Sequence, residues 1–424
     1  MKYVIEGGKS LKGNIAISGS KNAVMPILSA ALLIKGKTII RNVPSLLDVE
    51  IFFDIFKKIG VGISKENDDT YILDTTGDID PNISSYNIEK IRGSQTFLGA
   101  LLSRCNSVTI PSLGGCQIGS RPIDLHIKGL EALGAETNLI KGAIHMQTKK
   151  LKGNHIYLDY SSVGATENLI LAACMADGNT EIENAAQEPE IVDMINFLNK
   201  AGAKITGLGS KTLRIVGVKE LKPISHRVMP DRIEAGTYMI AAAITKGDLT
   251  LENIGVFDLS SLIFKLREIG ADITIINQDK LKITVNSRLS GFKIKTTPYP
   301  GFSTDLQSAM LSLACLSSGV SIIVETVFEN RFLIVPELIK MGAKIVTSDR
   351  MAIVTGVNEI NGAVVDSPDL RGGGALVIAS LAARGESEVT SIEKIERGYE
   401  NIDKKINAVG GSIKIVEGEN GSYR

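Results

Sequence analysis

Apolar and polar positions follow two periodicities along the chain, and the same order of elements recurs six times. In each copy, a run of small and apolar residues predicts a buried helix, and an alternating strand follows it. Because these helices are apolar nearly all round, we expect them inside the fold, with the strands and the charged helices outside. The predicted helix and strand pairs are 23–35 and 37–42, 97–103 and 107–111, 168–176 and 179–184, 238–245 and 248–253, 306–317 and 320–326, and 375–383 and 387–391.

A second recurring pattern marks where each charged helix ends. An apolar residue, a glycine and a small residue come together six times, at spacings from 202−134=68 to 134−60=74 residues. Glycine just beyond the last turn is typical of a helix C-terminus, because it adopts the left-handed conformation without steric cost. Six units predict an α/β (α+β) fold of two domains with three βαβαββ-like repeats each. We place the domains at residues 1–20 with 230–424, and at residues 21–229.

The composition restricts the kinds of partner. Lys and Arg total 47 and Asp and Glu total 47, so no basic field is available for nucleic acid or a membrane surface. The most apolar stretch, residues 23–34, is too short to span a bilayer, and the first residues lack the apolar run of a secretion signal. The four cysteines and four histidines show no metal-ligand spacing. We therefore expect a cytoplasmic protein without a structural metal.

The glycine-rich stretch 113–126 carries the most reactive candidate group. Its three glycines predict a loop, and Cys116 lies among them as an exposed thiol. Arg121 can lower the pKa of that thiol or hold an anion, and Pro122 restricts the backbone before a helix that carries His126. His126 follows the loop closely enough to touch a ligand. The alternative interpretation is a surface turn with an incidental thiol.

Charged residues recur where the buried helices begin. A helix N-terminus already presents unpaired N–H groups and a partial positive charge, so Lys or Arg there is unfavourable unless an anion binds. At any single position, the alternative is a solvated cap. The whole set predicts a cleft between the domains for a small, strongly anionic substrate, with Asp305 as its only well-placed carboxylate. The charged positions at helix starts and strand ends are Lys21, Arg92, Asp231, Arg232, Asp305, Arg331, Arg371 and Arg397. The residues expected to line the cleft are Lys21, Arg92, Arg121, Arg331, Arg371 and Arg397.

Seven segments spread over the chain resemble one enzyme family. They include Ser-Gly-Ser-Lys-Asn-Ala at 18–23 and Gly-Gly-Cys-Gln-Ile-Gly-Ser-Arg-Pro-Ile-Asp-Leu-His at 114–126, and the others are 162–166, 188–193, 230–236, 326–331 and 397–400. The chain resembles the UDP-N-acetylglucosamine 1-carboxyvinyltransferases. The resemblance implies the inside-out α/β barrel of the enolpyruvyl transferases. It also implies transfer of the enolpyruvyl group of phosphoenolpyruvate to the 3′-hydroxyl of UDP-N-acetylglucosamine, with release of phosphate, as the first committed step of peptidoglycan synthesis.

The same resemblance implies a catalytic set of Cys116, Asp305, Lys21 and Arg397. Cys116 is implied to be the general acid, to form a covalent adduct with phosphoenolpyruvate and to be alkylated by the inhibitor fosfomycin. Asp305 is implied to be the base on the sugar hydroxyl. No cofactor and no metal are implied.

The remaining implied residues bind substrate. Lys21, Arg121 and Arg397 are implied to hold phosphate, and Arg331 and Arg371 a carboxylate or the developing charge. Implied contacts to the nucleotide sugar or to phosphoenolpyruvate are Asn22, Arg92, Pro122, Ile123, Asp124, Leu125, Val163, Gly164, Asp305 and Val327.

The sequence also departs from the family pattern. Members often carry lysine where Leu47 and Tyr160 stand, which bears on substrate affinity, and Arg371 opens a stretch of three glycines that predicts a loose strand-to-helix turn. Two other functions stay open. One is 3-phosphoshikimate 1-carboxyvinyltransferase, whose Gly-Asn-Ala-Gly-Thr-Ala run the chain lacks, and the other is a non-catalytic paralogue that binds a nucleotide sugar. The sequence leaves the oligomeric state open, with a monomer compatible.

Overall fold

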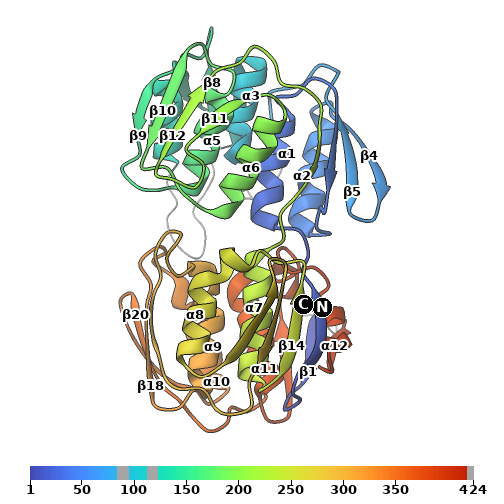
Figure 1. The fold of residues 1–424 in the computed structure, drawn as a ribbon, viewed down its shortest axis with the longest axis vertical. Coiled ribbons are helices and arrows are strands. Elements are labelled where there is room, and N and C mark those ends of the chain that lie inside the picture. Colours follow the sequence, from blue (N-terminus) through green and yellow to red (C-terminus); the bar gives the residue numbers. More distant parts are fainter. Residues whose placement is uncertain (84–94, 112–122, 418–424) are drawn as a thin grey trace, which may run out of the picture. The chain divides into compact units, whose positions relative to one another are not determined.

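The computed structural model describes residues 1–83, 95–111 and 123–417. These residues fold as two compact units. One unit comprises the described residues of Met1–Ser18 and Pro230–Arg424, and the other those of Gly19–Gly115 and Arg121–Met229 (Figure 1). The chain passes from the first unit to the second after Ser18 and returns after Met229.

The unit that begins at Gly19 holds three small sheets among its described residues. Their strand orders are β13-β3-β5-β4, β6-β8-β7 and β11-β12-β10-β9. The strands are β3 Lys37–Arg41, β4 Gly62–Asn67, β5 Thr70–Asp74, β6 Ser107–Pro111, β7 Glu136–Ile140, β8 Ala143–Gln147, β9 His155–Tyr157, β10 Asn179–Glu183, β11 Lys204–Thr206, β12 Thr212–Val216 and β13 Ser225–Arg227. The helices are α1 Lys21–Ala31, α2 Leu47–Lys58, α3 Phe97–Cys105, α4 Asp124–Ala132, α5 Val163–Ala173 and α6 Pro189–Lys200.

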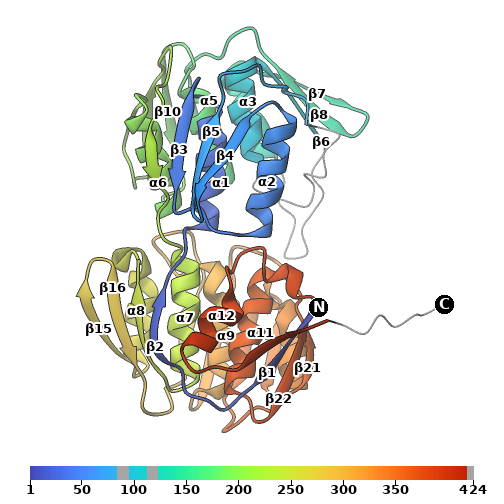
Figure 2. The same ribbon diagram turned by 90° about the vertical axis from the view of Figure 1, so that its right-hand side faces the viewer.

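The other unit repeats this plan with sheets β15-β16-β14-β2, β17-β18-β20-β19 and β21-β22-β1-β23 (Figure 2). Its strands are β1 Lys2–Glu6, β2 Lys12–Ala16, β14 Asp248–Glu252, β15 Asp272–Asn277, β16 Lys280–Thr284, β17 Lys293–Lys295, β18 Val320–Val324, β19 Lys344–Ser348, β20 Met351–Thr355, β21 Val364–Asp366, β22 Glu386–Thr390 and β23 Ile413–Val416. Its α-helices are α7 Arg232–Ile244, α8 Ser260–Glu268, α9 Gln307–Leu316, α10 Val335–Lys340, α11 Leu370–Ala382 and α12 Ile402–Ala408. Short 3-10 helices are η3 Val256–Leu259, η4 Thr304–Leu306, η5 Arg331–Ile334 and η6 Ile392–Lys394.

Each four-stranded sheet combines one parallel strand pair with two antiparallel pairs, whereas both pairs of the three-stranded sheet β6-β8-β7 are antiparallel. In β17-β18-β20-β19, for example, β17 runs parallel to β18, which pairs antiparallel with β20. The sheet that contains β1 follows the same rule, because β1 lies antiparallel between β22 and β23. The amino-terminal strand therefore completes the last repeat of the chain.

The buried helices lie inside the sheets, as the apolar pattern predicts. Helices α7, α9 and α11 contact one another in one unit, and α3 contacts α1 and α5 in the other (Figure 1). In α7 every residue after Arg232 is buried, so no face of that helix is left for water. The helix-end glycines all have positive φ, which confirms the left-handed stop: Gly60, Gly134, Gly202, Gly270, Gly342 and Gly410.

Three buried helices begin five to six residues earlier than the pattern predicts, at Val163, Arg232 and Leu370 rather than near 168, 238 and 375. The reason is side-chain capping. Ser162, Asp231 and Asp369 accept hydrogen bonds from N–H groups of the first turn. Each helix therefore begins directly after its cap, and its first turn includes residues that precede the apolar run.

The predicted glycine turn after Arg371 is therefore wrong. Its glycines lie inside α11, where a Cβ on Gly374 would come within 2.6 Å of the ring of Tyr399. The glycines thus permit close packing of α11 rather than a loose turn. Among the described helices, none is long and apolar enough to cross a membrane.

Candidate functional site

A carboxylate held by two buried guanidinium groups lies in the unit that contains α7 to α12. Asp305 is in η4, Arg331 opens η5 and Arg371 is in the first turn of α11. Nη2 of Arg331 pairs with Oδ1 of Asp305, and Nη2 of Arg371 lies 3.3 Å from Oδ2. The arginine side chains are 1% and 4% exposed, whereas Asp305 is 25% exposed. The carboxylate is therefore the part of this cluster that a ligand can reach.

A second carboxylate lies beside Arg331, and a third lies nearby in the chain around Thr304. Its Nη1 is 3.9 Å from Oδ1 of Asp369, the residue that caps α11, and its Nε donates to the carbonyl oxygen of Thr304. The buried Glu325 accepts from Thr304 Oγ1 at 2.9 Å and from the backbone N–H of Val327 at 2.7 Å. Asp369 is thus a second carboxylate beside Arg331, which was not predicted from the sequence. The sequence signal for Asp369 is an Asp two residues before Arg371, which is the spacing of a helix cap.

Arg371 is the cation of this cluster with a spare donor. Among the described residues, its buried Nη1 has no hydrogen-bond acceptor. Burial opposes the charged form, but Asp305 together with Tyr399 and Asp231 outweighs it, so the pKa of Arg371 is raised above its usual value. The guanidinium lies 5.5 Å from the ring centre of Tyr399. A permanently charged donor without a partner is suited to hold an anion.

Arg397 belongs to the segment that packs on the same helix. It is partly buried and is followed by Gly398, which contacts Leu370, and by Tyr399, which contacts Gly374. The structure thus brings the chain around Arg397 to the beginning of α11, near Arg371. Val327 also lies in this unit, just after β18.

In the other unit, Lys21 and Asn22 open α1. Nζ of Lys21 is 2.8 Å from Oδ2 of Asp48, an almost fully buried residue in the first turn of α2. This carboxylate compensates the cation at the helix start, so an anionic ligand is not required for that purpose. Asp48 is not among the residues predicted from the sequence. The available signal was an acidic residue in the otherwise apolar run 46–49.

Helices α4 and α5 bring together the candidate contacts to a nucleotide sugar. Ile123 immediately precedes α4, and Asp124 and Leu125 form its first turn. Val163 and Gly164 open α5. Arg92, Cys116, Arg121 and Pro122 lie outside the described residues.

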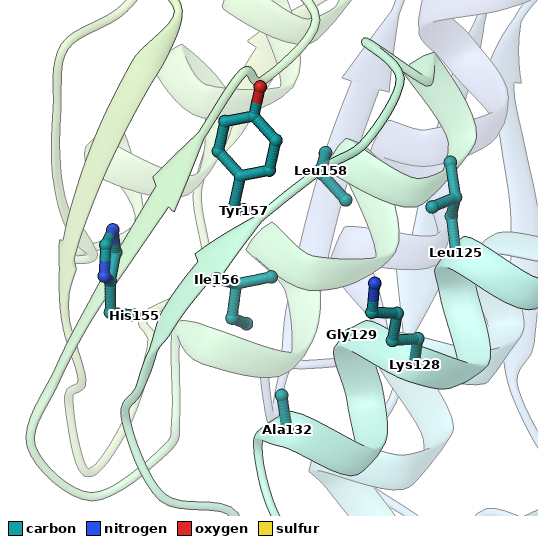
Figure 3. A pocket seen from close by; sticks show the side chains of 8 residues that line it. All are labelled: Leu125, Lys128, Gly129, Ala132, His155, Ile156, Tyr157 and Leu158. Carbon is teal, nitrogen blue, oxygen red and sulfur yellow. The ribbon is translucent and has the colours of Figure 1, made fainter.

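One hollow in this unit adjoins the candidate residues. Its volume is about 140 Å³, and it lies between α4 and the segment that includes β9 (Figure 3). Pockets that enclose small-molecule ligands measure roughly 300–1,000 Å³. The hollow is therefore too small to bury a nucleotide sugar. Its lining residues are Leu125, Lys128, Gly129, Ala132, His155, Ile156, Tyr157 and Leu158.

Within the described part of the chain, one group offers three metal ligands. His155, Glu181 and Glu183 lie on neighbouring strands β9 and β10. His155 Nε2 is already 2.9 Å from a carboxylate oxygen of Glu183, and Arg214 Nε is 2.6 Å from one of Glu181. Each potential ligand therefore has a protein partner.

Comparison with known proteins covers nearly the whole chain. The family model described as EPSP synthase (3-phosphoshikimate 1-carboxyvinyltransferase) matches residues 5–406. A UDP-N-acetylglucosamine 1-carboxyvinyltransferase of Carboxydothermus hydrogenoformans is 47% identical over 98% of this chain and 99% of its own. Enzymes of that name from Halothermothrix orenii and Caldanaerobacter subterraneus are each 46% identical, over 98% and 97% of this chain and 100% and 99% of their own. The chain belongs to the UDP-N-acetylglucosamine 1-carboxyvinyltransferase family.

Solved structures show the same fold for the family. The enolpyruvyl transferase NikO from Streptomyces tendae has a TM-score of 0.88 at 23% identity, covering 97% of this chain and 98% of NikO. EPSP synthase from Acinetobacter baumannii has a TM-score of 0.78 at 19% identity, covering 98% of this chain and 100% of that enzyme. The predicted fold class, the enolpyruvyl transferase α/β fold with buried helices, is confirmed.

Proposed function

We propose that this chain transfers the enolpyruvyl group of phosphoenolpyruvate to the 3′-hydroxyl of UDP-N-acetylglucosamine and releases phosphate, the first committed step of peptidoglycan synthesis. Relatives that carry this enzyme's name are 46–47% identical over nearly all of the chain. The structural observation that carries the proposal is the accessible carboxylate of Asp305 between two buried guanidinium groups. This arrangement sets a proton acceptor beside cations that suit an anionic donor.

The reaction needs protons to move in opposite directions in its two steps. When the sugar oxygen adds to C2 of phosphoenolpyruvate, Asp305 takes the hydroxyl proton and Cys116 supplies a proton to C3. Elimination then removes a proton from C3 while the bond from C2 to the phosphate oxygen breaks. One alcohol and one enol phosphate thus give one enol ether and one phosphate, without a cofactor or a metal. The adduct of the donor with Cys116 is part of this proposal.

Different cations bind the carboxylate and the phosphate of the donor. Arg331 and Arg371 hold the carboxylate or the developing charge, which is supported by the spare Nη1 donor of Arg371. Lys21, Arg121 and Arg397 hold the phosphate, and Lys21 and Arg397 join Cys116 and Asp305 as catalytic residues. The proposed contacts to the nucleotide sugar or the donor are Asn22, Arg92, Arg121, Pro122, Ile123, Asp124, Leu125, Val163, Gly164, Asp305 and Val327.

The wider assignment follows from the family. We propose residues 1–20 with 230–424 and residues 21–229 as the two domains, and cytoplasmic action in cell-wall synthesis, hence in cell shape and division. Phosphoenolpyruvate and UDP-N-acetylglucosamine are the proposed partners, without nucleic acid or membrane. Fosfomycin is the proposed inhibitor, through Cys116.

Phosphate release distinguishes the candidate activities. The chain is incubated with phosphoenolpyruvate and either UDP-N-acetylglucosamine or shikimate 3-phosphate, and release is expected only with the nucleotide sugar. Release only with the shikimate ester would instead support the activity that the family model names. Binding of the nucleotide sugar without any release would support a non-catalytic paralogue.

A matched pair of arginine variants tests the cluster. Arg331→Ala removes a 1%-exposed guanidinium and is expected to lower kcat/KM by about a hundredfold or more. Arg384→Ala removes a 77%-exposed guanidinium of the same unit and is expected to change kcat/KM by less than about twofold. Equal effects of the two substitutions would contradict the role given to Arg331.

A further inference from the structure

A buried carboxylate connects two segments of the candidate site. Glu325 directly follows β18 and is 1% exposed. Its Oε2 accepts from the hydroxyl of Thr304 at 2.9 Å. Its Oε1 accepts from the backbone N–H of Val327 at 2.7 Å and from that of Phe328 at 3.0 Å. Because an ionised carboxylate can only accept hydrogen bonds, these three donors fix its orientation, and Glu325 ties η4 to the loop that follows β18.

Both connected segments carry residues that are assigned to the reaction. Thr304 opens η4 immediately before Asp305, and its carbonyl oxygen accepts from Nε of Arg331 at 3.3 Å. The ring centre of Phe328 lies 5.4 Å from the guanidinium carbon of Arg331, which in turn pairs with Asp305. Thr304 is thus held at its hydroxyl by Glu325 and at its carbonyl by Arg331. Movement of either segment would change how the carboxylate and the guanidinium meet.

The other repeats use the position of Glu325 in a different way. In each of four other sheets, the residue that directly follows the corresponding strand has a φ between 55° and 59°, whereas Glu325 has no positive φ. In three of these sheets the residue is an asparagine whose Nδ2 donates to the carbonyl oxygen that follows the parallel neighbour strand. This position therefore joins the ends of two parallel strands there. The four counterparts are Asn42, Asn184, Asn253 and Ser391.

The repeat that contains β17 and β18 makes the same junction with the next residue along the chain. Oγ1 of Thr326 donates to the carbonyl oxygen of Thr296, and its backbone N–H donates to Oγ1 of Thr296 at 3.0 Å. Thr296 directly follows β17, the parallel neighbour of β18. The strand ends are thus joined without Glu325. An apolar side chain would fill this buried position without the cost of desolvating a charge, so what the carboxylate adds is the connection to Thr304.

We propose that Glu325 is a positioning residue that acts through Thr304 to hold the Asp305 carboxylate in place for proton transfer. The inference rests on the proposed function. With 1% exposure Glu325 leaves almost no surface for a ligand, so its effect passes through its neighbours. A displacement of about 1 Å at a reacting group can lower a rate about a hundredfold. Most proposed contacts of the nucleotide sugar lie in the other unit, so its affinity should change little.

Substitutions at Glu325 separate hydrogen bonding from packing. Glu325→Leu fills a similar volume without an acceptor and is expected to lower kcat for phosphate release by about thirtyfold or more. In the same variant, calorimetric titration should show a Kd for UDP-N-acetylglucosamine within about threefold of the unsubstituted chain. Glu325→Gln keeps an oxygen for the two N–H groups and an amide that can donate to the Thr304 hydroxyl, and is expected to retain kcat within about fivefold.

Thr304 provides a smaller change that acts on the same connection. Thr304→Val removes only the hydroxyl and is expected to lower kcat about tenfold, whereas Thr304→Ser restores the hydroxyl and should recover kcat to within about threefold. In the double variant with Glu325→Leu, Thr304→Val is expected to add no further loss, because the hydroxyl has already lost its partner. Ser312→Ala is the matched control: it removes a buried hydroxyl that donates to the carbonyl oxygen of Ala375 at 3.0 Å, and it should lower Tm but change kcat by less than about twofold.

The outcomes distinguish the inference from the proposed function. If the unsubstituted chain is active, a kcat within about threefold for Glu325→Leu, or an equal loss in Glu325→Gln, overturns the inference alone. Equal losses of kcat and of nucleotide-sugar binding, or additive losses in the double variant, would assign Glu325 to folding and also overturn it. Should Glu325→Leu not fold, an unchanged kcat in Thr304→Val overturns it. If the unsubstituted chain releases no phosphate with either acceptor, the proposed function fails and the inference fails with it.

Discussion

Replacing Asp305 by Asn tests whether its carboxylate is the catalytic base. The substitution keeps the shape of the side chain but removes a charge that lies 3.3 Å from Nη2 of Arg371 and also pairs with Arg331. At that distance the attraction is about 5 kcal/mol for an effective dielectric constant of about 20. Asp305 is 25% exposed, and Asp369 still lies 3.9 Å from Arg331, so solvent and the second carboxylate reduce the loss. We expect the free energy of unfolding to fall by about 2–3 kcal/mol.

The catalytic effect is expected to be much larger than the effect on stability. General-base catalysis contributes about 10²–10⁴-fold, so kcat for phosphate release should fall by that factor in Asp305→Asn. The assay uses saturating substrates, with urea unfolding and titration of UDP-N-acetylglucosamine on the same samples. Asp272→Asn, at an exposed position of the same unit, is the control and is expected to keep kcat within about twofold.

The result that would refute this reasoning is a kcat for Asp305→Asn within about tenfold of the unsubstituted chain. A loss of nucleotide-sugar binding that matches the loss of kcat would equally assign Asp305 to binding or folding rather than to proton transfer.

Three other expectations concern packing, protonation and thiol reactivity. Gly374→Ala puts a methyl group 2.6 Å from an aromatic ring and should destabilise the chain by about 1–3 kcal/mol in urea unfolding. Gly77→Ala, whose Cβ would meet only one atom, 3.9 Å away, should be close to neutral, and equal effects would contradict the packing argument. Burial raises the pKa of Glu234 to about 7, so between pH 4.5, near the pKa of the unfolded chain, and pH 7 the folded state binds an extra proton, and the free energy of unfolding should fall as pH rises through that window. Glu234→Gln should lose this part of the pH dependence, and an unchanged slope of the free energy of unfolding against pH would refute it. Fosfomycin should label Cys116, because burial raises the pKa of the Cys105, Cys174 and Cys315 thiols, that of the last two to about 12, and makes them less reactive. Peptide mapping that finds the label on any of these three cysteines would contradict this.

The sequence by itself determined the order and nature of the elements. Buried helices can be recognised because small and apolar residues occupy every face, and helix ends because glycine supplies positive φ at Gly60 and its five counterparts. These signals are local, so each repeat carries its own copy of them. The seven segments that resemble the family are local in the same way. They identified the family before any contact between distant residues was known.

Only the tertiary structure decided how charges and caps are partnered. Lys21 lies 27 residues from Asp48 in sequence, and Asp369 38 residues from Arg331, and no periodicity predicts either ion pair. Helices α5, α7 and α11 begin earlier in the chain than predicted because side-chain caps stabilise a first helical turn where a turn was expected. The orientation of the Asn168 amide in α5 depends on backbone groups of Gly99, in α3, and of Gln95, just before α3. Such features arise from three-dimensional proximity, because hydrogen-bond and ionic energies depend on distances that a linear pattern does not contain.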